Sequence, residues 1–164
     1  MLRGLPYPRA CVKSQGAVPN FNKENRAKVM TDKIAKEVAE LEFNRFVESM
    51  DLDVDQSDMD EDDKKGFLQQ KDRILSAIQN GSLVVLDTGE PVYTPQRTND
   101  AQAITFHEPT GASLMAMDRK KKTEDIGKLY AAMADITKTH ASNFSKMKMA
   151  DLKVCMAITT LFLG

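Results

Sequence analysis

The stretch AITFHEPTGASLMAMDRKK, residues 103–121, contains both a strand pattern and a helix pattern. Its opening part, up to His107, is rich in β-branched and aromatic side chains, as is typical of a strand. Pro109 interrupts the strand because proline has no amide hydrogen to donate. Beyond it, Thr110 or Ser113 can cap a helix. The apolar residues of this predicted helix are Leu114, Met115 and Met117. The stretch therefore predicts a mixed, α+β fold.

Two more helices are predicted on the C-terminal side. Residues 123–138 have apolar side chains at three- and four-residue steps, which is the period of an amphipathic helix. These side chains are Ile126, Leu129, Tyr130, Met133 and Ile136. A polar connection, THASNFS, leads to a helix over residues 146–163, which we expect to pack on the preceding helix. Its apolar face is formed by Leu152, Cys155, Met156, Thr159, Phe162 and Leu163, with burial starting near Leu152.

A β-hairpin is predicted on the N-terminal side of the opening stretch. The two β-rich runs are residues 83–86 and 92–94, and Asp-Thr-Gly-Glu-Pro separates them as a short turn. Pro91 and Pro95 flank the second run, so we expect that strand to be short and to lie at an edge of the sheet.

Two helices and an acidic link precede the hairpin. The first helix starts at Thr31 or Asp32, which can act as its N-cap, and its apolar residues form a broad face. These residues are Ile34, Ala35, Val38, Ala39, Leu41, Phe43, Phe46 and Met50. In residues 51–63, eight of thirteen side chains are acidic, so repulsion predicts an extended, solvated link. The second helix ends at Asn80-Gly81, and Phe67, Leu68, Ile74, Leu75 and Ile78 form its stripe.

The predicted architecture is α+β and mostly helical, with two N-terminal helices, a small antiparallel β element and about three C-terminal helices. We divide the chain into a disordered tail over residues 1–29, a helical region over 30–81 and a β-hairpin plus helical domain over 82–164. The tail has three prolines and no apolar core of a signal peptide. Met30 is a candidate for the true start of translation.

Composition excludes several classes of function. The formal net charge of -1 gives no overall attraction to nucleic acid or to anionic membranes. The longest apolar run, VCMAITTLFLG, covers 11 residues, which is shorter than the roughly 20 that a membrane-spanning helix needs. The two cysteines, Cys11 and Cys155, are expected to be unpaired thiols. The basic run at residues 119–122 is interpreted as the end of a helix, where cations are favourable.

No catalytic, metal or cofactor site is predicted. Asp51, Asp53 and Asp55 fit the start of a calcium loop, but Gln56 replaces the required glycine and Asp62 the closing glutamate. The histidines His107 and His140 have no zinc-ligand spacing. His107 and Glu108 could form a base and its orienting partner, but no nucleophile motif accompanies them. No glycine-rich phosphate loop is present in the sequence.

The ten methionines are the least ordinary feature of the composition, and six of them lie in the C-terminal half. Methionine is flexible and polarizable, so methionine-rich surfaces adapt to varied apolar partners. Two interpretations stay open. Most of these side chains fill gaps in the core, or some of them line a groove for a partner's helix.

Three stretches resemble the tail assembly chaperones of long-tailed bacteriophages. They are LVVLDTGEPVYTP at residues 83–95, ITFHEPTGASLMAMD at 104–118 and MADLKVCMAITTLFLG at 149–164. A strand ending in E-P-T-G-A and a late Asp-Leu before an apolar helix are the recurring marks, and the resemblance covers residues 82–164. It implies a non-enzymatic protein of the host cell cytoplasm that coats the hydrophobic tape measure protein before the tail tube polymerises. Such proteins are absent from the mature virion, and their genes often provide a frameshifted longer product.

We therefore expect a partner-binding surface on the two helices that follow Pro109. Its predicted residues are Leu114, Met115, Met117, Ile126, Leu129, Tyr130 and Met133. The expected partners are the tape measure protein, the tail tube protein as a further candidate, and other copies of the chain, with no nucleic acid, membrane or cofactor. The alternative is a structural tail or neck protein of the virion, because the two N-terminal helices and the acidic link distinguish this chain from shorter family members.

Overall fold

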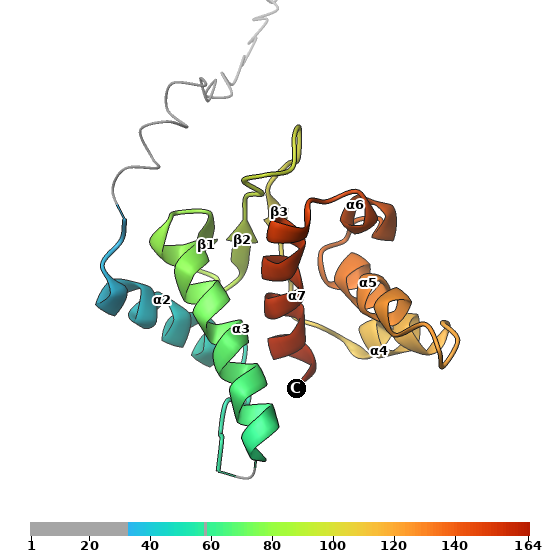
Figure 1. Ribbon diagram of the computed structural model, residues 1–164, viewed down its shortest axis with the longest axis horizontal. Coiled ribbons are helices and arrows are strands. Elements are labelled where there is room, and N and C mark those ends of the chain that lie inside the picture. The colour runs from blue at the N-terminus through green and yellow to red at the C-terminus, as the bar shows by residue number, and fades with distance from the viewer. Residues whose placement is uncertain (1–32, 58) are drawn as a thin grey trace, which may run out of the picture.

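The computed structural model describes residues 33–57 and 59–164, and these residues form six helices and a three-stranded sheet (Figure 1). The helices are α2 (Lys36–Ser49), α3 (Glu61–Gln79), α4 (Gly111–Asp118), α5 (Asp125–Ile136), α6 (Ala141–Ser145) and α7 (Met149–Leu163). The strands are β1 (Leu83–Val85), β2 (Pro91–Tyr93) and β3 (Ile104–Thr105). The fold is α+β and mostly helical, as predicted. The predictions for the tail at 1–29, Cys11, Met30, Thr31 and Asp32 lie outside the described residues.

The sheet is antiparallel with the order β1-β2-β3, so the prediction that β2 lies at an edge was wrong. Pro91 is the first residue of β2, where its missing amide hydrogen removes no necessary hydrogen bond. Its carbonyl oxygen accepts a hydrogen bond from the amide of Phe106 over 2.9 Å. Pro95 lies beyond the end of the strand. The hairpin itself is confirmed, with Leu83 opposite Tyr93 and Val85 opposite Pro91.

Only part of the predicted apolar face of α2 is buried. Ala39, Phe43, Phe46, Val47 and Met50 form the buried side. Ile34, Val38 and Leu41 are instead exposed by 37%, 47% and 66%. Val38 and Leu41 lie on an exposed side of the helix, and Ile34 precedes the helix, where its amide donates a hydrogen bond to the carbonyl oxygen of Gln79 over 2.9 Å. The helix also begins at Lys36, later than predicted, and Ala35 occupies the N-cap position.

Contrary to the prediction from its charge, the acidic link is not fully solvated, because part of it packs on the core. Leu52 and Val54 are part-buried against the core, while Asp51, Asp53 and Asp55 point to solvent. The link therefore lies along the domain surface through its apolar residues. At its end Asp60 caps α3 by accepting a hydrogen bond from the amide of Asp63 over 2.8 Å. The predicted C-terminal end of α3 is confirmed, since Asn80 is the C-cap and Gly81 has a φ of 73°.

The polar connection before the last helix contains the short helix α6, which the sequence analysis missed. Its position is fixed by Phe144, which is fully buried. The α5 helix agrees closely with its prediction, and α7 begins three residues later than predicted. α7 packs mainly on α3 and secondarily on α5, so the prediction that α5 is its support was only partly correct.

One hydrophobic core joins the N-terminal helical region to the C-terminal part. α7 is central in this arrangement, with α2 and α3 on one side and α5 and α6 on the other (Figure 1). Phe46 of α2 and Phe162 of α7 meet edge to face with ring centroids 5.6 Å apart. Residues on both sides of the predicted boundary between residues 81 and 82 therefore belong to the same core.

Candidate functional site

The start of α4 is fixed by its own side chains and by α5. Of the two predicted caps, Thr110 is the N-cap, and its hydroxyl accepts a hydrogen bond from the amide of Ala112 over 3.3 Å. The hydroxyl of Ser113 accepts one from the amide of Thr110 over 3.3 Å. It also donates to Oδ2 of Asp135 on α5 over 2.6 Å, and Ser113 is fully buried. The capping hydrogen bonds fix the first turn of α4, and the Ser113–Asp135 hydrogen bond attaches this turn to α5.

This polar attachment leaves much of the apolar surface of α4 and α5 exposed. Leu114 and Met115 are each exposed by 60%, and Ile126 is exposed by 67%. Met117, Leu129 and Tyr130 are part-buried, and the last two contact the core with one side. Met133 is fully buried and belongs to the core. Of the predicted partner-binding residues, only Met133 is therefore without surface. We call the other six the α4–α5 surface.

The basic run lies between the two helices of this surface. Arg119 is the C-cap of α4, as the interpretation of a helix end requires. Lys120, Lys121 and Lys122 follow it and are exposed. Among the described residues, these four cations make no ion pair with a carboxylate. The exposed apolar residues are thus followed in the chain by four cations that are not held in ion pairs within the described residues.

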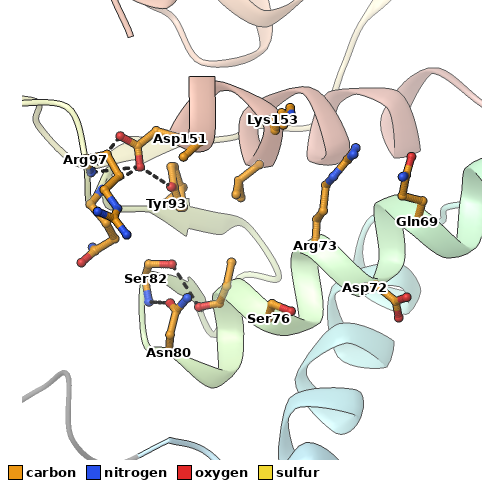
Figure 2. Close-up of a pocket in the computed structure, with 14 residues that line it drawn as sticks. Gln69, Asp72, Arg73, Ser76, Asn80, Ser82, Tyr93, Arg97, Asp151 and Lys153 are labelled. Atoms are coloured by element: carbon orange, nitrogen blue, oxygen red, sulfur yellow. Dashed lines mark hydrogen bonds between the residues drawn. The ribbon is translucent and has the colours of Figure 1, made fainter. Parts of the chain in front are cut away.

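A second polar centre surrounds Asp151 in the first turn of α7 (Figure 2). Oδ1 of Asp151 accepts hydrogen bonds from Tyr93 Oη and Gln96 N, each over 2.8 Å. Oδ2 accepts from the amides of Arg97 and Thr98 over 2.9 and 2.7 Å. It also accepts from Thr98 Oγ1 over 2.7 Å. Asp151 is almost fully buried, and these five donors attach the end of β2 and the segment after it to the start of α7.

The hydrogen bonds keep Asp151 ionised despite its burial. Burial alone would raise its pKa, but the donors, with Thr98, Gln96 and Tyr93 foremost, hold the pKa below its ordinary value. The same environment acts oppositely on Tyr93, because burial and then the adjacent carboxylate raise the pKa of its phenol. The pair therefore consists of an anionic acceptor and a neutral donor at neutral pH.

A hollow of about 450 Å³ opens beside this centre. It is lined by α3 and the turn that follows it, by the end of β2 and the segment after it, and by the first turns of α7. Its charged residues are Asp72, Arg73, Arg97, Asp151 and Lys153. In Figure 2, Arg73 points from α3 toward α7, whereas Asp72 lies on the side of α3 away from α7. The five donors already satisfy Asp151, so the positive side chains dominate the accessible rim.

His107 has a different partner from the predicted one. Its Nδ1 lies 2.7 Å from Oε1 of Glu90 in the hairpin, and Glu108 is exposed. The hydrogen bond with His107 lowers the pKa of Glu90. The pair fastens the end of β3 to the hairpin. Neither residue lines the hollow beside Asp151.

The acidic link uses two of its carboxylates internally. Asp53 accepts a hydrogen bond from the amide of Asp55, and Asp55 accepts from the amide of Ser57 over 2.9 Å and from its hydroxyl. Over residues 33–57 and 59–164, no group of three or more His, Cys, Asp or Glu side chains is arranged to hold a metal ion.

Sequence reasoning missed the Asp151 centre and the hollow. In the sequence, Asp151 stands out only as part of the Asp-Leu mark of the resemblance. A signal was nevertheless present, because an aspartate at the start of a mostly apolar helix needs hydrogen-bond donors when it is buried. The donors themselves are mostly backbone amides of residues 96–98, and side-chain identity does not reveal where such amides point.

No helix within the described part of the chain is both long enough and apolar enough to span a membrane. No protein-family model, no curated protein and no solved structure matches this chain.

Proposed function

We propose that the protein is a phage tail assembly chaperone that binds the hydrophobic tape measure protein through the α4–α5 surface. The observation that carries this proposal is the exposure of Leu114, Met115 and Ile126 on two helices attached to each other by Ser113 and Asp135. Several large apolar side chains exposed on two helices that pack on each other are typical of an interaction site. The resemblance of residues 82–164 supplies the identity of the partner.

The chemistry of this surface suits a helical client with apolar stripes. Leucine, methionine and isoleucine supply contact area without directional hydrogen bonds, so they tolerate variation along a long client. The polar contacts of Ser113 fix α4 without using its apolar side chains. The surface is therefore free for a partner while the domain is folded. In this proposal the complex forms in the host cytoplasm and is released before the virion matures.

The test is co-purification of the tape measure protein with a variant carrying Met115→Asp and Ile126→Asp. Each carboxylate would be desolvated in the complex without a partner, which costs on the order of several kcal/mol. Both positions are exposed in the free protein, so its melting temperature should stay near that of the parent. The matched control carries Leu41→Asp and Leu68→Asp, which change exposed leucines on α2 and α3.

We expect the α4–α5 variant to lose the client and the control to retain it. Equal recovery of the tape measure protein with both folded variants would contradict the proposal. Mass spectrometry of purified virions distinguishes the chaperone from the alternative, a structural protein of the virion. Stoichiometric presence of the protein in mature particles would favour a structural tail or neck subunit.

A further inference from the structure

We infer that the hollow beside Asp151 is a second binding site, which takes an acidic peptide segment of a partner protein. This site goes beyond the proposed function, because none of its lining residues belongs to α4 or α5. It is formed by α3, the segment after β2 and α7, so it exists only in the folded chain.

The first argument is charge. Arg73, Arg97 and Lys153 line the hollow, and in the described part of the chain none of them forms an ion pair with a carboxylate. Within residues 33–57 and 59–164, the guanidinium of Arg73 donates one hydrogen bond, to Oε1 of Gln70 over 3.0 Å. Besides Asp151, Asp72 is the single carboxylate among the lining residues, so three cations line the hollow with one exposed carboxylate. The free hydrogen-bonding capacity of the hollow is therefore mainly cationic.

The second argument concerns the kind of anion. A compact phosphate site usually combines cations with several converging backbone amides. Here the amides of Gln96, Arg97 and Thr98 already donate to the Asp151 carboxylate. What remains is a set of long side chains on separate segments, together with the amide side chains of Gln69 and Asn80. Such a distributed arrangement fits carboxylates spaced along a peptide better than one small anion.

The third argument is that the base of the hollow is fixed. Asp151 is held by five donors, and Thr98 Oγ1 additionally accepts a hydrogen bond from the amide of Lys148 over 2.9 Å. The backbone of Arg97 is therefore positioned before any ligand arrives. Arginines can bind carboxylates through two parallel hydrogen bonds, so the two arginines set the preference for acidic side chains.

Fluorescence anisotropy with the full chain tests the inference. The probe is a fluorescein-labelled peptide of four Glu-Ser repeats, and its matched control is a peptide of four Gln-Ser repeats. The test variant carries Arg73→Gln and Arg97→Gln. The control variant carries Lys120→Gln and Lys121→Gln, which remove the same charge from exposed positions outside the hollow.

We expect the glutamate peptide to bind the parent and the control variant alike, and the arginine variant at least about tenfold more weakly. Binding should also weaken between about 50 and 300 mM salt. Equal affinity of both variants, equal binding of the glutamine peptide, or no binding up to about 1 mM peptide would overturn the inference. Complete competition by about 10 mM inorganic phosphate would assign the site to small anions instead, which also overturns it. The arginine variant should still recover the tape measure protein, so this test is independent of the α4–α5 surface.

Discussion

Tyr93 on the middle strand donates a hydrogen bond from its phenol to Oδ1 of Asp151 on α7 over 2.8 Å. The two residues are 58 positions apart, and both are buried. This contact joins the sheet to the helix that carries much of the core. The same carboxylate accepts hydrogen bonds from the amides of residues 96–98. Tyr93 and Asp151 both line the hollow, so their contact helps to fix its shape.

Removing the Tyr93 hydroxyl should weaken the fold modestly. We expect Tyr93→Phe to lower the free energy of unfolding by about 1–2 kcal/mol, because one donor to a buried carboxylate is lost. The measurement is urea unfolding followed by circular dichroism. Tyr130→Phe is the matched control, since the Tyr130 hydroxyl makes no hydrogen bond within residues 33–57 and 59–164. Equal effects of the two substitutions would contradict the role of the Tyr93–Asp151 contact.

Asp151 should also shape the acid stability of the protein. Its folded-state pKa lies below the ordinary value of 3.8, so its ionised form stabilises the fold fully above that value. This contribution is lost as the pH falls through the ordinary pKa toward the folded one. Asp151→Asn should therefore lower the free energy of unfolding at pH 7 by about 2–4 kcal/mol. Below about pH 4, the free energy of unfolding of this variant should fall less steeply with decreasing pH than that of the parent. The measurement is urea unfolding at pH 3, 4 and 7. An equal decrease in the free energy of unfolding of parent and variant between pH 7 and pH 3 would contradict this prediction.

The thiol of Cys155 should be unreactive in the folded protein. Cys155 is fully buried, and burial, followed by the charge of Asp151, raises the pKa of its thiol to about 12. At pH 8 we expect iodoacetamide to modify Cys155 only after denaturation in guanidinium chloride. Peptide mapping by mass spectrometry reports Cys155 separately from Cys11. Equal rates of Cys155 alkylation in native and denatured protein would show that α7 opens readily.

The hydroxyl of Ser113 should control the attachment of α4. Ser113→Ala removes an acceptor for the amide of Thr110 and a donor to Asp135, so we expect a loss of roughly 1–3 kcal/mol. Because α4 carries half of the α4–α5 surface, recovery of the tape measure protein should fall as well. Ser142→Ala, at an exposed serine of α6, is the control and should leave both properties unchanged. Unaltered stability of the Ser113 variant would mean that packing alone holds α4.

The signals that predicted the fold correctly were local ones. Glycine at position 81 takes the left-handed conformation that ends α3, and Thr110 supplies the cap of α4. Both effects depend on side chains within one turn, so they can be inferred from neighbouring residues. The hairpin likewise followed from two β-rich runs and the turn between them.

The errors concern contacts between distant segments. The α2 helix has apolar residues on two sides, and only the packing of α3 and β1 decides that Ala39 and Phe43 are buried while Val38 and Leu41 are exposed. The central position of β2 depends on β3, which pairs with it across a long connection. The Asp151 centre required backbone amides that no residue type identifies. For these features the sequence offers several possible buried faces, strand orders and hydrogen-bond partners, and only the tertiary packing decides which of them form.

Phe162 should contribute to the fold and not to an interface. It is exposed by 8%, and its ring meets that of Phe46 edge to face at 5.6 Å. We expect Phe162→Ala to lower the free energy of unfolding by roughly 3–5 kcal/mol, because the substitution leaves a cavity where α2 and α7 meet. Leu163→Ala is the control at the next position, where the side chain is only part-buried, and should have a smaller effect.

A double-mutant cycle makes the structural reason specific. If the aromatic contact matters, Phe46→Ala and Phe162→Ala should be non-additive by about 0.5–1.5 kcal/mol beyond the loss of buried area. Thermal unfolding and client recovery should be measured on the same samples. A Phe162→Ala variant that melts near the parent temperature but no longer recovers the tape measure protein would place Phe162 in an interface. A variant with a strongly lowered melting temperature and a measurable coupling to Phe46 would place it in the core that joins the N-terminal helices to α7.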